Sequence, residues 1–360
     1  MQYRHLVDFN DITASQWNAL YRLGRDIMHD PQKYADSCKG KVLATLFYEP
    51  STRTMLSFQT AMLRLGGSVI GFDSPANSSV SKGENLKDTI TIISSYADII
   101  AMRNPQEGAA LAASLYSTCP VINAGDGGHF HPTQTLTDLT TITMEKGKLD
   151  GLTIGLCGDL KHGRTVHSLL RALSVLGKNT YYLVSTLTLK MPQYIIDTLR
   201  ESGNMVYELT SLDDCIEELD ILYMTRIQKE RFQSEDMYKK ESGKYILTPE
   251  KLLHAKPDLS ILHPLPRVDE ISSEVDFDKR AMYFKQAENG MYIRMALILT
   301  MLKNGKFMPD IYECKDVKNT MRCPNPVCVT NTEKYLPPLT YTLGGTRPGH
   351  ACKYCDFRID

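Results

Sequence analysis

Residues 42–65 read VLATLFYEPSTRTMLSFQTAMLRL, a short apolar run followed at once by a longer amphipathic one. The run 42–47 has the length and composition of a buried strand, and 51–65 repeats apolar residues at helical spacing. A strand that passes directly into a helix is the repeating unit of a parallel sheet covered by helices. This stretch therefore predicts an α/β fold.

The same alternation continues along most of the chain and restarts once, near residue 150. The expected strands are 42–47, 68–72, 99–102 and 121–123 in the first set, and 153–157, 181–184, 206–209, 221–225 and 260–262 in the second. The expected helices are 51–65, 84–96, 107–116, 164–176, 192–202, 212–218 and 249–255. We expect a helix at 133–146 to bridge the two sets, and the segment 287–302 to cap one of them.

The expected architecture is α/β, with two domains that each contain a parallel sheet flanked by helices, plus a small C-terminal zinc-ribbon-like β module. The expected bounds are 1–132 plus 288–309 for one domain, 133–287 for the other, and 310–360 for a linker and the module. Lys and Arg number 41 against 42 Asp and Glu, a net charge of -1, so no global charge favours nucleic acid or an anionic membrane. Without a signal peptide or a span-length apolar run, the expected location is the cytoplasm.

An anion site is predicted where the first strand meets its helix. Ser51, Thr52, Arg53 and Thr54 supply three hydroxyls and a guanidinium beside the unpaired N–H groups of a helix start. The simpler alternative is that Ser51 is an ordinary helix cap and Arg53 a solvated surface residue.

Two further strand ends of the same sheet carry similar groups. Arg103 directly follows one strand, and a Gly-rich turn after the next presents His131 and Gln134 as a helix opens. An Arg fork binds phosphate oxygens, and a neutral His can donate to a carbonyl oxygen that gains negative charge. Taken alone, each is also explained by a salt bridge or a structural histidine, but three strand ends together favour an anion pocket. Lys82, in the polar loop 78–84, would matter only if something places it over that pocket.

The second set of strands presents Arg164 and Arg226 at two of its ends, which suits a substrate with carboxylates. Surface ion pairing is the alternative for each. The turn after Gly155 lacks the G-x-G-x-x-G spacing, so a nicotinamide site is only a second candidate. Leu265 and Pro266 lie in a Pro-rich turn at the last strand end, where an X-Pro bond can be cis and backbone carbonyls can face a ligand.

Five of the nine cysteines lie in the last 47 residues. Four form a C-x4-C and a C-x2-C pair: Cys323, Cys328, Cys352 and Cys355. This spacing in a cytosolic chain predicts a structural zinc site, with a disulfide as the alternative. The residues from 323 to 360 include four basic and three acidic side chains, which is a poor footprint for nucleic acid.

Taken together, the motifs 47–54, 102–108, 131–134, 158–168, 224–231 and 263–271 resemble the aspartate carbamoyltransferase family, in order, over roughly the first 305 residues. The segments MTRIQKER and HPLPR resemble the aspartate branch rather than the ornithine branch. The resemblance implies transfer of the carbamoyl group from carbamoyl phosphate to the amine of L-aspartate in pyrimidine synthesis. It implies no cofactor at the active site and no covalent enzyme intermediate.

The resemblance also implies a role for individual residues. The carbamoyl phosphate ligands would be Ser51, Thr52, Arg53, Thr54, Arg103, His131 and Gln134 with the carbonyls of Leu265 and Pro266, and the aspartate ligands Lys82, Arg164, Arg226 and Gln228. Arg53, Thr54, Lys82, Arg103 and His131 would be catalytic, and Glu49, Arg164 and Arg231 would tie the two domains on closure. Lys82 would come from a neighbouring subunit of a homotrimer, with further assembly left open, and the resemblance leaves open whether Ser78 or Ser79 faces the substrate.

The cysteine-rich tail is similar to the zinc domain of the regulatory chain in the same family, through CPNPVCV and CKYC. The hypothesis for this chain is that the tail clamps catalytic subunits without binding nucleotides itself. Two other classes stay open at this stage, a nicotinamide-dependent oxidoreductase and a non-catalytic zinc-containing scaffold.

Overall fold

The computed structural model describes residues 4–9, 12–228, 232, 234–314, 322–343 and 348–359. It divides into two compact units, residues 1–133 with 291–360 and residues 134–290. The boundaries fall inside two helices, α5 (Pro132–Lys146) and α9 (Tyr283–Leu302). Among the described residues, no helix combines the length and the apolar character that a membrane span needs.

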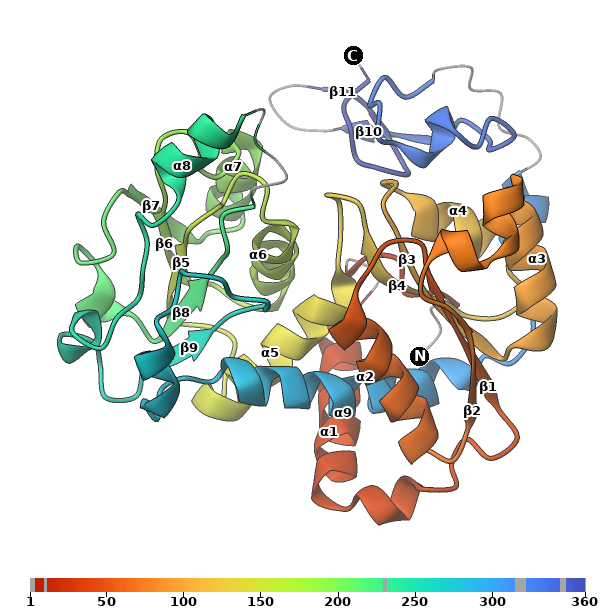
Figure 1. Ribbon diagram of the computed structural model, residues 1–360, viewed down its shortest axis with the longest axis horizontal. Coiled ribbons are helices and arrows are strands. Elements are labelled where there is room, and N and C mark those ends of the chain that lie inside the picture. Colours follow the sequence, from red (N-terminus) through yellow and green to blue (C-terminus); the bar gives the residue numbers. More distant parts are fainter. Residues whose placement is uncertain are drawn as a thin grey trace. The chain divides into compact units, whose positions relative to one another are not determined.

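The first unit is built on a four-stranded parallel sheet in the order β2-β1-β3-β4. Its strands are β1 (Val42–Phe47), β2 (Ser68–Phe72), β3 (Ile99–Asn104) and β4 (Val121–Asp126). Its helices include α2 (Thr52–Arg64), α3 (Leu86–Tyr96) and α4 (Ala109–Tyr116), and Figure 1 shows them around this sheet. The central strands β1 and β3 are almost entirely buried, as the continuous apolar runs predicted.

The sequence analysis did not predict helix α1 (Ala14–His29). Its start has a capping box, in which Thr13 accepts from the Gln16 backbone N–H and the Gln16 side chain accepts from Thr13 N–H. Gly24 lets the helix pack closely in the core, since an added Cβ would lie 3.2 Å from Ile293 Cδ1 of α9.

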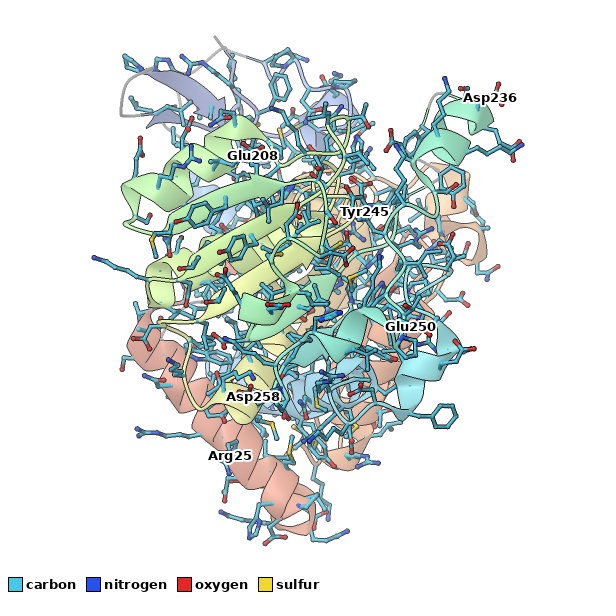
Figure 2. The ribbon with its side chains drawn as sticks, turned by 90° about the vertical axis from the view of Figure 1, so that its left-hand side faces the viewer. Arg25, Glu208, Asp236, Tyr245, Glu250 and Asp258 are labelled. Atoms are coloured by element: carbon cyan, nitrogen blue, oxygen red, sulfur yellow. The ribbon has the colours of Figure 1, made fainter. Side chains whose placement is uncertain are left out.

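The second unit contains a five-stranded parallel sheet in the order β7-β6-β5-β8-β9. Its strands are β5 (Thr153–Cys157), β6 (Thr180–Val184), β7 (Met205–Leu209), β8 (Ile221–Met224) and β9 (Ser260–Leu262). Its helices include α6 (Arg164–Leu176), α7 (Gln193–Glu201) and α8 (Glu235–Glu241). Figure 2 marks Glu208 on the exposed edge strand β7 and Tyr245 in the segment after α8.

Two predicted helices of this unit are wrong. The segment 212–218 has only a 3-10 turn at Ile216–Glu218, and 249–255 has only one at Lys251–Leu253. In 212–218 the buried Leu212, Cys215 and Ile216 pack in the core without a helix, and in 249–255 Leu252 is buried but Leu253 is exposed. Helix α8, which the analysis did not predict, lies between them in the sequence.

The cysteine-rich tail belongs to the first unit. Its strands β10 (Thr340–Leu343) and β11 (Gly349–Cys352) pair antiparallel. The four cysteines, with Val329, Leu336 and Tyr354, share one buried apolar cluster with the alanines of α4. The small side chains of α4 let the tail pack closely on this helix, so the two have a common core.

Candidate functional site

The strand orders place the predicted site residues at a particular point of each sheet. In the first sheet the strand order reverses between β1 and β3, and in the second between β5 and β8. Open parallel sheets bind ligands outside the carboxyl ends of the strands at such a reversal. Ser51 to Thr54 follow β1, and Arg164 and Arg226 follow β5 and β8. Arg103 lies inside β3, as its second-to-last residue, because this strand extends two residues beyond the predicted 99–102.

The phosphate motif lies at the amino end of α2. Ser51 is the residue before the first helical turn, yet its hydroxyl makes no capping hydrogen bond. The simpler reading of Ser51 as an ordinary cap is therefore not supported. Arg53 lies on the first turn of α2, where its side chain is exposed. Desolvation of the guanidinium by the surrounding protein still lowers its pKa below the ordinary value. The motif thus presents hydroxyls, backbone N–H groups and a cation from one helix end.

Arg103 and His131 converge in the first unit. Both side chains pack against Gly125, where an added Cβ would lie 3.0 Å from Arg103 Nη1 and 3.4 Å from His131 Cδ2. The φ of Gly125 is +120°, a backbone conformation that favours glycine. The guanidinium also donates to the Ala124 carbonyl at 3.4 Å, and its Nη2 lies 2.8 Å from Glu49 Oε1. A cation and an imidazole, separated by 28 positions in sequence, are thereby brought together.

His131 is buried, and its Nδ1 lies 3.5 Å from the Thr133 hydroxyl. Lys82, by contrast, is exposed in the 3-10 turn Ser79–Lys82. The two serines of that loop bond within it, Ser78 to the Pro75 carbonyl and Ser79 to Glu84. Which serine faces a substrate therefore stays open.

In the second unit, Gln134 is fixed by a buried carboxylate. Its Nε2 donates to Asp138 Oδ1 at 2.7 Å, and the same carboxylate accepts from Tyr223 at 2.9 Å and from Gln286 at 2.6 Å. Asp138 is completely buried, and these three hydrogen bonds offset the free-energy cost of burying its carboxylate. Asp138 thereby fixes the orientation of the Gln134 amide group.

The carboxylate-binding candidates are held by neighbouring loops. Arg164 is the first residue of α6, and Arg226 lies two residues after the end of β8. Gln228 Nε2 donates to the His162 carbonyl at 3.2 Å. Gly158, with φ +120°, lies against the Thr225 carbonyl, where an added Cβ would come within 2.3 Å. This glycine serves close packing between the two loops rather than a dinucleotide.

The Pro-rich turn is rigidly held. The Leu265–Pro266 bond is cis, a form that the sequence allowed at this turn. His263 Nε2 lies 2.7 Å from Glu270 Oε1, and His263 Nδ1 accepts from the Leu265 backbone N–H at 2.8 Å. The imidazole therefore orients the Pro264–Leu265 peptide, which directly precedes the Leu265 carbonyl predicted to face a substrate.

The structure describes two of the three residues that were predicted to tie the domains together on closure, Glu49 and Arg164. Arg231 lies outside the described residues. Glu49 pairs with Arg103 within the first unit, as given above. The roles of Glu49, Arg164 and Arg231 in closure stay predictions.

The four tail cysteines form a candidate metal centre. Their Sγ atoms are all buried and lie within 4.8 Å of one another. Cys323 and Cys355 are 3.5 Å apart at Sγ, and Cys328 and Cys352 are 3.8 Å apart. Tetrahedral zinc with Zn–S bonds of about 2.3 Å requires S···S separations of roughly 3.8 Å. The donor set therefore fits a four-coordinate thiolate site, and among the cysteines with described side chains none forms a disulfide.

The candidate metal centre is attached to the body by specific contacts. Glu333 accepts from the Leu86 backbone N–H at 3.2 Å, and the Tyr335 hydroxyl accepts from Lys87 N–H at 2.8 Å. Both bonds satisfy first-turn N–H groups of α3. At Gly108, whose φ is +82°, an added Cβ would lie 2.4 Å from Tyr354 Cβ. The tail thus lies directly against the segment between β3 and α4.

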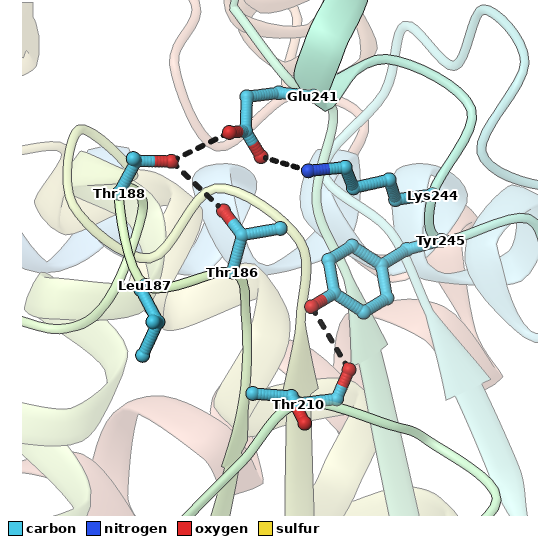
Figure 3. A pocket seen from close by; sticks show the side chains of 7 residues that line it. All are labelled: Thr186, Leu187, Thr188, Thr210, Glu241, Lys244 and Tyr245. Atoms are coloured by element: carbon cyan, nitrogen blue, oxygen red, sulfur yellow. Dashed lines mark hydrogen bonds and ion pairs between the residues drawn. The ribbon is translucent and has the colours of Figure 1, made fainter.

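A separate cavity of about 400 Å³ lies beyond β6 and β7 in the second unit (Figure 3). Glu241 accepts there from Thr188 at 2.8 Å and from Lys244 at 3.1 Å, and Tyr245 donates to the Thr210 carbonyl. Burial raises the pKa of Glu241, but the Thr hydroxyls and Lys244 lower it below its ordinary value. The polar groups bond to one another, and no predicted site residue lines the cavity.

No role was predicted from the sequence for His129, Asp126 or Asp356, whose side chains lie together in the structure. His129 lies only two residues before His131, so the motif itself contained the signal. Asp356 directly follows the last cysteine of the C-x2-C pair, and nothing in the sequence connects it with residue 129.

Comparisons with known families cover nearly the whole chain. A model described as "Aspartate/ornithine carbamoyltransferase, carbamoyl-P binding domain" matches residues 4–145, and the "Asp/Orn binding domain" of the same family matches 150–301. Residues 315–360 match "Aspartate carbamoyltransferase regulatory chain, metal binding domain".

Individual relatives agree with these matches. The aspartate carbamoyltransferase catalytic subunit of Clostridium perfringens is 57% identical over 303 residues, 84% of this chain and 99% of that protein. The catalytic subunit of the M. jannaschii enzyme superposes with a TM-score of 0.79 at 47% identity, covering 84% of this chain and 99% of that one. The Trypanosoma cruzi enzyme, solved in complex with carbamoyl phosphate and aspartate, gives 0.78 at 38% identity, with 82% and 96% covered.

Proposed function

The chain belongs to the aspartate carbamoyltransferase family, and from that membership we propose that it transfers the carbamoyl group of carbamoyl phosphate to L-aspartate. The products are N-carbamoyl-L-aspartate and phosphate, as in pyrimidine synthesis. The observation that best supports this reaction is the convergence of Arg103 and His131 on Gly125 at the carboxyl edge of the first sheet. A cation and a hydrogen-bond donor at one point suit a carbonyl that becomes an oxyanion.

Carbamoyl phosphate is assigned mainly to the first unit. Ser51, Thr52, Arg53 and Thr54 hold the phosphate at the amino end of α2, together with Arg103. Thr54, Arg103 and His131 donate to the carbamoyl oxygen. Gln134 and the carbonyls of Leu265 and Pro266 bind the carbamoyl amino group, because they offer acceptors that Asp138 and His263 hold in place.

L-Aspartate is assigned to Arg164, Arg226, Gln228 and Lys82. The two guanidinium groups neutralise its carboxylates, and Gln228 adds an amide held by the His162 carbonyl. Lys82 is exposed on its own chain, which suits a role in the site of a neighbouring subunit. We therefore propose a homotrimer in which adjacent subunits share active sites.

The proposed reaction needs no nucleophilic side chain. The neutral amine attacks the carbonyl carbon and a C–N bond forms. The C–O bond to phosphate then breaks, and phosphate leaves with that electron pair and takes up the proton that the attacking nitrogen loses. Binding two anionic substrates side by side removes most of the entropic barrier. Arg103 and His131 then stabilise the negative charge on the tetrahedral carbon's oxygen, and Arg53 stabilises the departing phosphate. We propose no cofactor and no covalent intermediate for this site.

The metal centre is proposed to hold structural zinc. Four buried thiols favour a soft ion with tetrahedral geometry. Hydrogen bonds from Cys352 and Cys355 lower the pKa of Cys328, and hydrogen bonds with Cys328 and Cys352 raise the pKa of Cys355. Zinc would replace the thiol protons and link the two cysteine pairs. A cytoplasmic location is proposed with it, because a reducing compartment keeps the thiols available.

The proposal is tested by a colorimetric assay for carbamoyl aspartate with the purified metal-loaded protein. We expect product from carbamoyl phosphate and L-aspartate, and far less when L-ornithine replaces aspartate. Omitting aspartate controls for hydrolysis. Product from ornithine alone would move the chain to the other branch of its family, and nicotinamide-dependent turnover without any carbamoyl transfer would refute the proposal.

A further inference from the structure

The tail contacts the body at two points beside predicted catalytic residues. One contact is made by Glu107, four residues after Arg103, and the other by His129, two residues before His131. Both lie in the first unit. The segment directly after β3, the strand that carries Arg103, and the turn before His131 therefore each have a direct neighbour in the tail.

The first contact is a short bridge of parallel backbone. Glu107 N–H donates to the Val327 carbonyl at 3.0 Å, and Val329 N–H donates to the Glu107 carbonyl at 2.9 Å. The Glu107 carboxylate also accepts from Asn325 Nδ2 at 2.7 Å. Since Asn325 and Val327 lie between Cys323 and Cys328, this cysteine pair is attached directly to the loop after β3.

The second contact is a histidine between two carboxylates. His129 Nδ1 lies 3.3 Å from Asp126 Oδ2, and His129 Nε2 lies 3.3 Å from Asp356 Oδ2 in the tail. The imidazole is 11% exposed, so the tail covers it. Burial alone would lower the pKa of His129, but Asp126 and Asp356 raise it to about 10. The ring also packs on Phe130, with centroids 3.6 Å apart.

Asp126 transmits this contact to the turn that presents His131. Its Oδ1 accepts from the Phe130 backbone N–H at 3.0 Å and from Asn123 Nδ2 at 3.0 Å. Its Oδ2 accepts from the Gly108 backbone N–H at 2.9 Å. One buried carboxylate therefore joins the turn before His131 to the loop after Arg103, and His129 joins that carboxylate to the tail.

We propose that Asp356 and His129 are positioning residues, through which the docked tail fixes the turn 126–131 and so the placement of His131 for catalysis. This inference rests on the proposed carbamoyl transfer. The tail is then more than a clamp between subunits, because it completes the support of the active site on its own chain. Neither residue needs to touch a substrate.

The test is Asp356→Asn in the metal-loaded protein. Asn has nearly the same shape and tolerates the φ of +57° found at residue 356. It removes the negative charge that faces His129 and leaves a neutral amide group in place of the carboxylate. We expect kcat to fall about ten- to one-hundredfold, because an error near 1 Å in a catalytic group costs about that much. We expect both KM values to change less than threefold and bound metal to stay at the wild-type level.

The matched control is Asp36→Asn, the same chemical change at an exposed position of the first unit. A second variant, His129→Asn, keeps a bond to Asp126 within reach but cannot extend to Asp356. The double variant should be no slower than the slower single variant, since both changes break one connection. Amide exchange in residues 124–131 should speed up in both variants and stay unchanged in the control.

A kcat for Asp356→Asn within twofold of the control, with metal bound and exchange unchanged, would overturn the inference. If that variant loses its metal, His129→Asn decides in the same way, because it leaves the cysteine pairs untouched. If the wild-type protein makes no carbamoyl aspartate, the proposed reaction has failed. Amide exchange then still tests whether Asp356 and His129 order the turn.

Discussion

Replacing Gly108 by alanine tests how closely the tail must approach the body. The φ of Gly108 is +82°, a conformation that L residues rarely adopt. An added Cβ would also lie 2.4 Å from Tyr354 Cβ and 2.5 Å from its carbonyl oxygen. Both atoms belong to the segment between Cys352 and Cys355, so the methyl group can be accommodated only if the tail moves away.

The two effects have separable magnitudes. A left-handed backbone costs an L residue about 1–2 kcal/mol relative to glycine. Forcing an extra methyl into a packed contact costs about 1–3 kcal/mol more. Gly40 provides the first effect alone, because its φ is +76° and nothing lies within 4 Å of an added Cβ. Gly108→Ala should therefore be less stable than Gly40→Ala by about 1–3 kcal/mol.

The assay is chemical denaturation of the metal-loaded variants, followed by transfer of the metal to a chromophoric chelator under native conditions. The clash should weaken docking roughly 5- to 150-fold, the factor that corresponds to 1–3 kcal/mol. Metal release should accelerate in Gly108→Ala and not in Gly40→Ala. Equal stability of the two variants within about 0.5 kcal/mol, with equal release rates, would refute the packing described for Tyr354.

Four further outcomes are expected. Arg53→Ala should lower turnover by several orders of magnitude, and near-normal activity would remove Arg53 from the phosphate site. His131→Ala should reduce kcat strongly with only a modest loss of carbamoyl phosphate affinity, whereas unchanged turnover would mean a structural histidine. Verified removal of the metal should lower the melting temperature or the assembly size, and no change in either would argue against a structural centre. Burial raises the pKa of Glu270, but His263 and backbone N–H groups bring this pKa below its ordinary value. The ionised Glu270 therefore stabilises the folded state fully at pH values above its unfolded pKa of about 4.3. This contribution to the free energy of unfolding is lost as the pH falls through the lower folded pKa. Glu270→Gln should flatten that acid limb in pH-dependent unfolding, and an unaltered limb would exclude Glu270 as its source.

Much of the fold could be predicted because its central strands are buried on both faces. Runs such as 42–47 and 153–157 are mostly apolar, and the structure places β1 and β5 at those bounds. Helix α1 was not predicted although its buried residues Trp17, Leu20, Gly24 and Ile27 have helical spacing. The segment 212–218 was assigned wrongly because Leu212, Cys215 and Ile216 also have helical spacing, and over less than two turns such spacing does not separate a helix from a buried loop.

Part of the candidate site could also be predicted from the sequence. Residues at strand ends, such as Arg103 and His131, can be grouped from sequence because parallel strands end at one edge. The cysteine spacing likewise predicts the cluster that the four Sγ atoms form. The contact between Asp356 and His129 joins positions 227 residues apart, and no local pattern encodes such a pairing. The sequence also gave no sign that the tail shares a core with α4.

Because the tail docks on its own chain, dilution of the protein should not separate the tail from the body. Glu333 and Tyr335 bond to the start of α3 within one polypeptide, so docking is a unimolecular step. A tethered partner acts at an effective concentration in the millimolar range, however dilute the protein is. A metal-binding domain on a separate chain would dissociate once the protein concentration fell below its dissociation constant. In this chain, the fraction of bodies that carry a docked tail should be the same in a nanomolar assay as in a concentrated stock.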